Sequence, residues 1–314
     1  MISVLTVCRE LPDNYQLYGK PVAAFIFEQN ESIEKLGVEY EYYLIKKGGL
    51  KGYIFHVKDF AKFLRDNGYK YDIIHAHSGH MGILANFQRS IPVVTTFHGS
   101  DINNLLTRLL SIFSLILSKK NIFVSKRLLG KSIVKRKAVV IPCGVDFDIF
   151  KPMDKNDCRK ELGFPLNRKL VLFGGRFDIK VKNASLAKRS LENLPNYDLI
   201  ELKGYKRDEV AKLINACDCM LLTSITEGSP MVIKEALACN CPIVSVDVGD
   251  VKELSKGIDG VFISRYNSEE ISENIVLAVE YNNIDSRSKI EFLDKQKTAT
   301  QIYNIYVDAI KGLN

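Results

Sequence analysis

Short apolar runs alternate with longer amphipathic stretches along almost the whole chain. Runs of strand length occur at 2–8, 39–45, 73–75, 93–97, 122–124 and 139–141, and a second series occurs at 170–173, 199–202, 220–223, 243–246 and 261–263. Helical patterns fall between them, for example at 59–67 and 105–117, and one more closes the chain at 298–313. This repeated order of strand and helix is typical of parallel sheets covered by helices, so it predicts an α/β fold.

A segment rich in chain breakers divides the two series. It runs from Pro142-Cys143-Gly144 to Pro152. The 314 residues are also too many for a comfortable single core. We therefore expect two domains of similar size, at 1–148 and 149–296, and a cleft between the carboxyl edges of their two sheets.

Charge separates the two halves further. Residues 1–150 hold 20 Lys and Arg against 13 Asp and Glu, whereas residues 151–314 hold 24 of each kind. No acidic residue occurs between Asp101 and Asp146. The first half is therefore expected to face something anionic. Nucleic acid is a poor match, because the basic segment lacks interleaved aromatics apart from Phe113 and Phe123.

The chain begins directly with a strand pattern, and its most apolar stretch, 105–117, is shorter than the roughly 20 residues of a membrane-spanning helix. These features predict a cytoplasmic protein. The cysteine count of seven is odd, and the C-x-C pairs have no matching histidines, so buried free thiols are expected rather than disulfides or zinc.

Two carboxylates eight residues apart, Glu227 and Glu235, surround a predicted helix start. Glu227 follows the apolar strand at 218–223, where open α/β sheets bind ligands. Ser229 suits an N-cap and Pro230 suits the first helical position, so the helix start could bind a phosphate or diphosphate. The alternative is one surface acid and one helix acid on a solvated face.

A second loop in the same half carries cations. Gly174 and Gly175 follow the strand at 170–173, and Arg176 and Lys182 precede the next helix. Glycines allow close approach of the backbone to a ligand, while Arg and Lys bind phosphate. Alone, this loop could be an ordinary turn with solvated bases. Together, the two loops favour a nucleotide-sugar site. In such a site Glu227 would bind a hexose, Glu235 would bind a ribose, and the two cations would bind the diphosphate.

In the first half, polar side chains follow two strands. His98 and Asp101 come directly after the strand at 93–97, and His77 follows the strand at 73–75. His98 is expected to reach the cleft, where His77 and Asp101 are candidates for acceptor contacts. A turn at Gly19 precedes a helix and could bring N–H groups to the same diphosphate.

Three histidines close together, His75, His77 and His80, could suggest a metal. The only acid close in sequence is Asp72, on the far side of the strand, so packed and hydrogen-bonded histidines are the preferred interpretation. No metal site is predicted.

These motifs together resemble the retaining GT-B glycosyltransferases of family 4. The resemblance rests on Glu227-Gly228-Ser229-Pro230 with Glu235, Gly174-Gly175-Arg176 with Lys182, His98-Gly99-Ser100-Asp101, and Ile141-Pro142-Cys143-Gly144-Val145-Asp146. The segment 240–251 is similar to the branch that builds teichuronic acid and other bacterial surface polysaccharides. The family implies two Rossmann-like domains, with the helix at 297–314 crossing back to the first domain.

By position, the resemblance implies a role for each motif residue. Glu227 would contact the donor sugar, Glu235 the ribose, and His98 the reacting sugar. Arg176 and Lys182 would hold the diphosphate, with Gly175 beside them. The loop after the strand at 218–223 would bind the donor through Gly228, Ser229, Pro230, Met231 and Val232. In it, the backbone of Ser229, Met231 and Val232 would contact sugar and phosphate. The chain departs from the family pattern at Gly19, which stands where a glycine pair is common, and at Cys143, where Asn is common.

The expected reaction is transfer of a hexose with retention, from a UDP-sugar rather than a GDP-sugar, without a cofactor or divalent metal. The expected acceptor is a glycan linked to polyprenyl diphosphate. The segment 105–118 places Thr107, Ser111, Ser114 and Ser118 on one narrow face, with apolar residues over the rest, and basic residues follow it. We therefore expect peripheral binding at the inner face of the plasma membrane, on an anionic surface.

Two rival interpretations remain, and the first of them shares the fold and the donor site. A GT-B-type nucleotide-sugar epimerase would use the donor site without an acceptor and would not need a basic apolar face. A non-catalytic sugar-binding subunit would be favoured had Arg176, Lys182 or Glu227 been lost, and all three are present.

Overall fold

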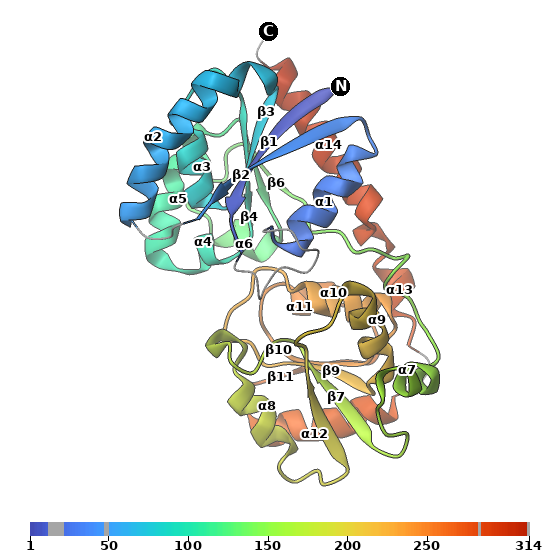
Figure 1. Cartoon of the computed structure of the whole chain (residues 1–314). Helices are drawn as coiled ribbons and strands as arrows, with labels where there is room; N and C mark the ends of the chain where they lie inside the picture. The colour runs from blue at the N-terminus through green and yellow to red at the C-terminus, as the bar shows by residue number, and fades with distance from the viewer. Residues whose placement is uncertain (12–21, 47–49, 282–283, 313–314) are drawn as a thin grey trace. The chain divides into compact units, whose positions relative to one another are not determined.

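The computed structural model describes residues 1–11, 22–46, 50–281 and 284–312 (Figure 1). The chain divides into two compact units. The N-terminal unit combines Met1–Gly144 with Lys295–Asn314, and the C-terminal unit is Val145–Asp294. The first boundary therefore falls four residues before the one expected from the chain breakers, 144 instead of 148, and the second falls at 294 instead of 296.

The N-terminal unit is built on a parallel sheet in the order β2-β1-β3-β4-β5-β6. Its strands are β1 (Ile2–Arg9), β2 (Val38–Ile45), β3 (Ile73–His77), β4 (Val93–Phe97), β5 (Lys120–Phe123) and β6 (Ala138–Val140). Val4 of β1 pairs in register with Ile73 of β3, and Ile74 of β3 with Val93 of β4. All these pairings are parallel, which is the arrangement that alternating strands and helices produce.

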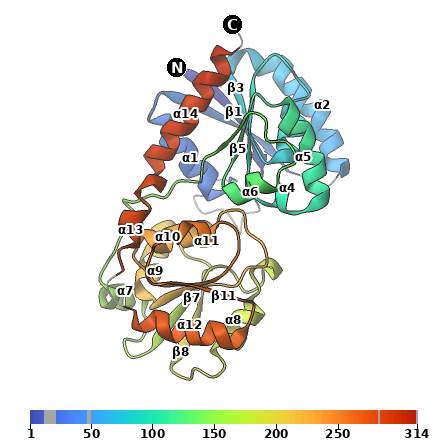
Figure 2. The same cartoon turned by 180° about the vertical axis from the view of Figure 1, so that it is seen from behind.

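Helices cover both faces of this sheet. They are α1 (Ala24–Glu34), α2 (Leu50–Asn67), α3 (Gly79–Ala85), α4 (Ser100–Asn103), α5 (Leu105–Leu117), α6 (Lys126–Lys131) and α14 (Lys295–Lys311), with the 3-10 turn η2 (Gly68–Lys70). Helices α1 and α14 lie side by side on one face, and α2, α3 and α5 lie on the other (Figures 1 and 2). Successive residues of β1 serve both faces, because Val4 packs with α14 while Leu5 packs with Met81 of α3.

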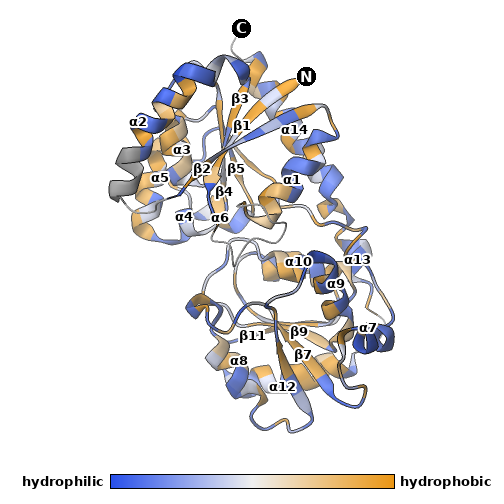
Figure 3. Ribbon diagram, in the orientation of Figure 1, coloured by the Kyte–Doolittle hydropathy of each residue, from blue (hydrophilic) through white to orange (hydrophobic). Residues whose placement is uncertain are grey.

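The C-terminal unit holds a second parallel sheet in the order β11-β10-β9-β7-β8. Its strands are β7 (Lys169–Phe173), β8 (Tyr197–Glu201), β9 (Cys219–Leu222), β10 (Ile243–Val246) and β11 (Val261–Ser264). The central strands are fully buried and strongly hydrophobic (Figure 3), as expected for a sheet covered on both faces.

Helices α8 and α12 lie on one face of this sheet, and α9 and α10 lie on the other (Figures 1 and 2). The helices of the unit are α7 (Lys155–Leu162), α8 (Ala184–Leu191), α9 (Arg207–Ala216), α10 (Met231–Ala238), α11 (Val251–Leu254), α12 (Ser268–Glu280) and α13 (Ser286–Lys289), with 3-10 turns η3 (Lys180–Lys182) and η4 (Glu291–Leu293). Both units thus have the predicted α/β class with a parallel sheet.

Helix α5 is oriented opposite to an ordinary amphipathic helix. Its serine face is buried, and Ser111 and Ser114 are 0% exposed, whereas Leu106 is 68% and Phe113 60% exposed. Of its apolar residues, Leu115 is buried in the core with Phe97 and Phe123, so the helix packs partly on its sheet and leaves much of its apolar face exposed. A Cβ at Gly79 of α3 would lie 2.0 Å from Ser111 Oγ, so small residues bring α3 and α5 into close contact. Among the described residues, no helix has the length and hydrophobicity needed to cross a membrane.

Candidate functional site

In the C-terminal unit, the turn after β7 is tied to the end of the neighbouring strand β9. The Thr223 hydroxyl contacts the carbonyl oxygens of Lys182 and Asn183, each at 3.0 Å, and the N–H of Ile225 donates to the carbonyl of Val181 at 2.8 Å. Thr223 lies directly after β9, so these bonds hold the η3 turn at the carboxyl edge of the sheet. The turn therefore has a defined position beside the loop that carries Glu227.

Lys182 and Glu227 form an ion pair at this edge. Lys182 Nζ lies 2.7 Å from Glu227 Oε1, and the two side chains are 24% and 16% exposed. Gly175 lies beneath the lysine, because a Cβ there would lie 2.7 Å from Lys182 Cγ. A partly buried, hydrogen-bonded pair of this kind is better fixed than a surface pair. The structure thus brings together three residues that the sequence placed in one donor site.

Arg176 is held by an acid of its own loop. Its Nε and Nη2 lie 3.0 and 2.5 Å from the two carboxylate oxygens of Asp178. The Arg176 hydrogen bond is the main cause that lowers the pKa of Asp178 below its ordinary value. The bidentate pairing orients the guanidinium, and it was not anticipated from the sequence. The Arg-x-Asp spacing is the signal that could have indicated it.

Ser229 does not cap helix α10. The helix begins at Met231 and Pro230 precedes it, whereas Ser229 Oγ donates to Asp250 Oδ2 at 2.6 Å. The expectation of a serine N-cap is therefore wrong. The physical reason is the close approach of the loop after β10, where Gly249 has a φ of +58° and a Cβ would lie 2.9 Å from Pro230 Cδ.

Asp250 is a buried carboxylate behind this loop. Burial raises its pKa, while the charge of Lys234 and the Ser229 hydrogen bond act in the opposite direction. Lys234 is itself fully buried. The sequence analysis assigned no role to either residue, because their contact joins a helix to a loop far away in sequence. The signal available was a lysine next to Glu235 on the mostly apolar helix α10.

Glu235 lies on α10, just over one helical turn after the first helical residue, Met231. It is 3% exposed, and its Oε1 lies 2.6 Å from Arg207 Nη2 at the start of α9. The Arg207 guanidinium also lies over the ring of Phe150 at 4.6 Å. Arg207 thus fixes the orientation of Glu235, a contact between residues far apart in sequence that the motif alone could not indicate.

In the N-terminal unit, His98 follows β4 and contacts His77 of β3. Their Nε2 and Nδ1 atoms are 3.0 Å apart, and the rings are stacked with centroids at 5.3 Å. The ring of Phe25 of α1 also packs against His98, with 4.8 Å between the two ring centroids. The structure therefore brings His77 and His98 together, as expected for residues at adjacent strand ends.

Asp101 is buried and holds two turns in place. Its carboxylate accepts the backbone N–H groups of Gly79 at 3.1 Å and Gly99 at 2.9 Å. Burial raises the pKa of Asp101, and these hydrogen bonds act in the opposite direction. Its carboxylate therefore organises the starts of α3 and α4. Gly19 lies outside the described residues.

His75 and His77 are packed within the sheet of the N-terminal unit. His75 Nδ1 lies 2.6 Å from the Tyr306 hydroxyl, and Nε2 lies 2.7 Å from Thr96 Oγ1. Burial, and after it the charge of His98, lowers the pKa of His75 to about 3. Among the described residues, no group of three His, Cys, Asp or Glu side chains is arranged to hold a metal ion.

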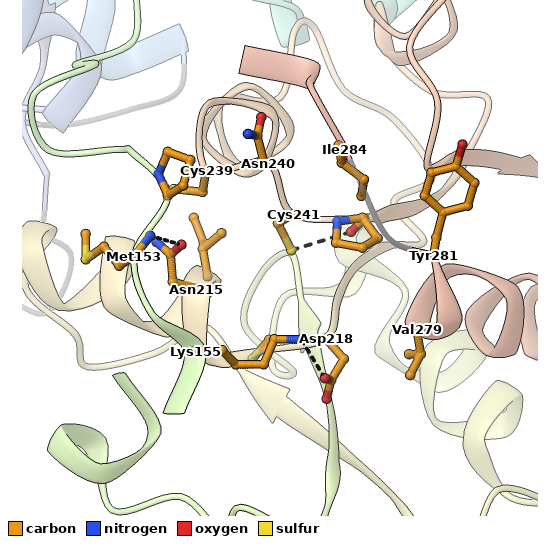
Figure 4. A pocket seen from close by; sticks show the side chains of 14 residues that line it. Met153, Lys155, Asn215, Asp218, Cys239, Asn240, Cys241, Val279, Tyr281 and Ile284 are labelled. Carbon is orange, nitrogen blue, oxygen red and sulfur yellow. Dashed lines mark hydrogen bonds and ion pairs between the residues drawn. The ribbon is translucent and has the colours of Figure 1, made fainter. Parts of the chain in front are cut away.

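A pocket of about 280 Å³ lies at the opposite, amino-terminal edge of the C-terminal sheet (Figure 4). Lys155, Asn215, Asp218 and Cys241 contribute to its lining. Its main polar groups already bind one another, because Lys155 pairs with Asp218 at 2.8 Å and Asn215 Oδ1 accepts the N–H of Met153 at 2.9 Å. The pocket is therefore separate from the edge that carries Lys182 and Glu227.

Two family models of glycosyltransferases match segments of the chain. Residues 8–149 match the family model "Glycosyltransferase Family 4", and residues 160–280 match "Glycosyl transferases group 1". The putative teichuronic acid biosynthesis glycosyltransferase TuaC of Bacillus subtilis is 27% identical over 238 residues, which are 65% of this chain and 60% of that protein. The chain thus spans less than two thirds of the length of this relative.

Solved structures share the fold at low identity. Sucrose-phosphate synthase from Thermosynechococcus elongatus has a TM-score of 0.82 at 14% identity, over 99% of this chain and 100% of that chain. HepE from Anabaena, solved in complex with UDP and glucose, has a TM-score of 0.75 at 16% identity, over 98% of this chain and 100% of that chain. The chain therefore has the GT-B fold, which confirms the predicted fold class, and each of its two units contains a segment that matches a glycosyltransferase family model.

Proposed function

We propose that the protein moves a hexose, or a hexose derivative, from a nucleotide-diphosphate sugar to a lipid-linked glycan, with retention at the anomeric carbon. The proposed setting is bacterial surface-polysaccharide synthesis at the inner face of the plasma membrane. The similarity to a putative teichuronic acid glycosyltransferase supports this setting. UDP is the preferred nucleotide, in keeping with the UDP bound to HepE.

The observation that carries the proposal is the Lys182–Glu227 pair at the carboxyl edge of the second sheet. The edge presents both signs of charge at one place: a cation suited to a phosphate and an acid suited to sugar hydroxyls. The start of α10 adds backbone N–H groups at Met231 and Val232, which favour an anion. A nucleotide-diphosphate sugar carries both groups that such an edge can bind.

Binding of the donor would redistribute these contacts. Lys182 and Arg176 each hold a carboxylate in the structure, at 2.7 and 2.5 Å. A diphosphate brings a denser negative charge, so the two cations would turn toward it while Glu227 accepts hydrogen bonds from the hexose. Glu235, oriented by Arg207 through Oε1, would accept a ribose hydroxyl at its other oxygen.

The chemical step breaks the bond between the anomeric carbon and the phosphate oxygen. The acceptor oxygen then bonds to the same face of the sugar, and its proton passes to the departing diphosphate. Preorganised cations are most valuable at this point, because negative charge grows on the leaving group. We assign His98 the contact with the transferred sugar. Since Arg176 and Lys182 supply the positive potential, the reaction should not need a divalent metal.

Transfer rates of matched lysine variants test this assignment. Lys182→Met should lower kcat/KM by about 100- to 1000-fold, the usual loss for one such electrostatic group. Lys180→Met is the control, because Lys180 lies in the same turn and is exposed. It should keep activity within about twofold, and EDTA should leave the wild-type rate unchanged. Equal losses in both variants, or inhibition by EDTA, would contradict the proposed mechanism.

The N-terminal unit, which would bind the acceptor, is proposed to dock on an anionic lipid surface through helix α5. We define the α5 surface by its exposed apolar side chains, which are Leu105, Leu106, Leu109, Leu110, Phe113 and Ile116. Cations border it. Arg108 donates to the carbonyl of Lys131 at 3.4 Å, and Lys131 Nζ lies 2.7 Å from Asn103 Oδ1. An apolar face with a basic border is the arrangement that anionic membranes bind.

The cations beside the α5 surface lie close enough to repel one another. Burial, followed by the charges of Arg127 and Arg108, lowers the pKa of Lys131. The same holds for Lys137, whose pKa is lowered by burial and then by Arg136, Lys119 and Arg89. Like charges concentrated in this way favour an anionic partner. A polyprenyl-diphosphate carrier presents such an anion within a lipid surface.

A further inference from the structure

In the N-terminal unit, a polar network runs along the face of β3 that packs against Tyr306 of α14. His75 bonds through Nδ1 to Tyr306 of α14 and through Nε2 to Thr96 of β4. The Tyr306 hydroxyl also lies 3.1 Å from that of Tyr40. Both ring nitrogens of His75 therefore have an oxygen partner. The rings of His75 and His77 lie 4.3 Å apart, so His77 continues the network toward His98.

His77 is satisfied at only one of its two nitrogens. Its Nδ1 lies 3.0 Å from Nε2 of His98. Its Nε2 is buried and has no hydrogen-bond partner within the described part of the chain. The side chain is 4% exposed. Burial, followed by the neighbouring His75 and His98, lowers the pKa of His77 well below its ordinary value, so the ring is neutral.

A neutral imidazole carries one N–H group and one bare nitrogen, and the surroundings select between them. A proton on Nε2 of His77 would be a buried donor without an acceptor, which is rarer in proteins and costlier than an acceptor without a donor. A proton on Nδ1 instead forms the bond to His98. The proton between the two rings therefore belongs to His77.

We propose that His77 donates from Nδ1 to Nε2 of His98 and thereby holds His98 as the Nδ1–H tautomer. His77 is then a positioning residue that determines which atom of His98 can donate. The tautomer itself follows from the N-terminal unit alone. Only its use, as a donor to an oxygen of the transferred hexose, rests on the proposed function.

Nitrogen NMR of the full chain labelled with ¹⁵N-histidine tests the assignment. Long-range proton–nitrogen spectra distinguish the two tautomers of each of the five histidines, and His56→Gln and His80→Gln assign two of the remaining signals. We expect His98 to carry its proton on Nδ1 in the wild type and in His77→Asn, whose amide can donate from a similar position. In His77→Phe the donor is lost, so the His98 population should shift toward Nε2–H.

A wild-type His98 with its proton on Nε2 would overturn the proposal, and so would an unchanged tautomer in His77→Phe. If His77→Phe does not fold, the wild-type and His77→Asn spectra still decide. In transfer assays, His77→Phe should lower kcat about tenfold with little change in KM, and His77→Asn should restore it. Failure of the wild type to bind any nucleotide sugar would refute the proposed function and leave the tautomer result standing.

Discussion

At the scale of single residues, Gly175 determines how Lys182 can lie. The glycine sits under the aliphatic part of the lysine, where a Cβ would come within 2.7 Å of Cγ and 2.8 Å of Cδ. The lysine reaches Glu227 at 2.7 Å along this path. The missing side chain at position 175 therefore supports the geometry of the ion pair, besides allowing a ligand to approach the backbone.

Gly175→Ala should weaken donor binding more than it weakens the fold. The added methyl displaces a flexible side chain and no backbone atom, so the free energy of unfolding should change by about 1 kcal/mol or less. Displacement of Lys182 should raise the Kd for the nucleotide sugar about tenfold, equal to about 1.4 kcal/mol. Thermal unfolding and calorimetric titration measure the two effects.

Gly130→Ala is the matched control, because a Cβ at Gly130 of α6 meets no atom within 4 Å. It should leave donor affinity unchanged. A Gly175→Ala protein that binds the donor as tightly as the wild type would show that the position of Lys182 does not matter to the donor.

Some residue contacts could be predicted and others could not. Lys182 and Glu227 were placed together because both follow neighbouring parallel strands, which end at one edge. Arg207 with Glu235 and Ser229 with Asp250 were not predicted, since each pair joins loops or helices whose approach the local pattern does not encode. The error at Ser229 has the same origin, because its hydroxyl bonds across loops instead of capping its own helix.

At the scale of elements, helix α5 shows that small polar residues can form the buried face of a helix. The stripe of Ser111 and Ser114 faces α3, where a Cβ at Gly82 would lie 2.7 Å from Ser114 Cβ. The serine hydroxyls are satisfied within the structure, for example Ser111 Oγ to the Thr107 carbonyl at 2.8 Å. Close packing of small residues therefore joins α5 to α3, while Leu115 adds an apolar contact to the core. The strands, by contrast, follow their apolar runs closely.

The exposed α5 surface should bind anionic vesicles. The wild type should float with phosphatidylglycerol vesicles and stay behind with phosphatidylcholine vesicles. Leu106→Glu combined with Phe113→Glu should abolish flotation, because it places charges in the apolar face. Arg127→Gln should reduce binding about fivefold, corresponding to about 1 kcal/mol for one base near the surface.

Leu277→Glu is the control for this experiment, because Leu277 is 55% exposed on α12 of the C-terminal unit. It should float like the wild type. Equal binding to both kinds of vesicle, or normal flotation of the double α5 variant, would remove anionic lipid as the partner of this surface.

At the scale of the whole molecule, two parallel sheets account for the match to GT-B structures. The alternation of strands and helices was enough to predict two α/β domains. The strand order β11-β10-β9-β7-β8 was not predicted, because parallel partners are selected by crossover helices and not by any property of the strands alone. Recognition of the donor, as we propose it, would depend on a few side chains at one edge of the second sheet.

The central claim is that this edge binds a nucleotide-diphosphate sugar, and thermal unfolding with a panel of UDP- and GDP-sugars tests it most directly. A UDP-sugar at about 100 times its Kd should stabilise the wild type by about 2.7 kcal/mol. The same ligand should stabilise Lys182→Met far less. No shift with any nucleotide sugar, or an equal shift in Lys182→Met, would contradict the account.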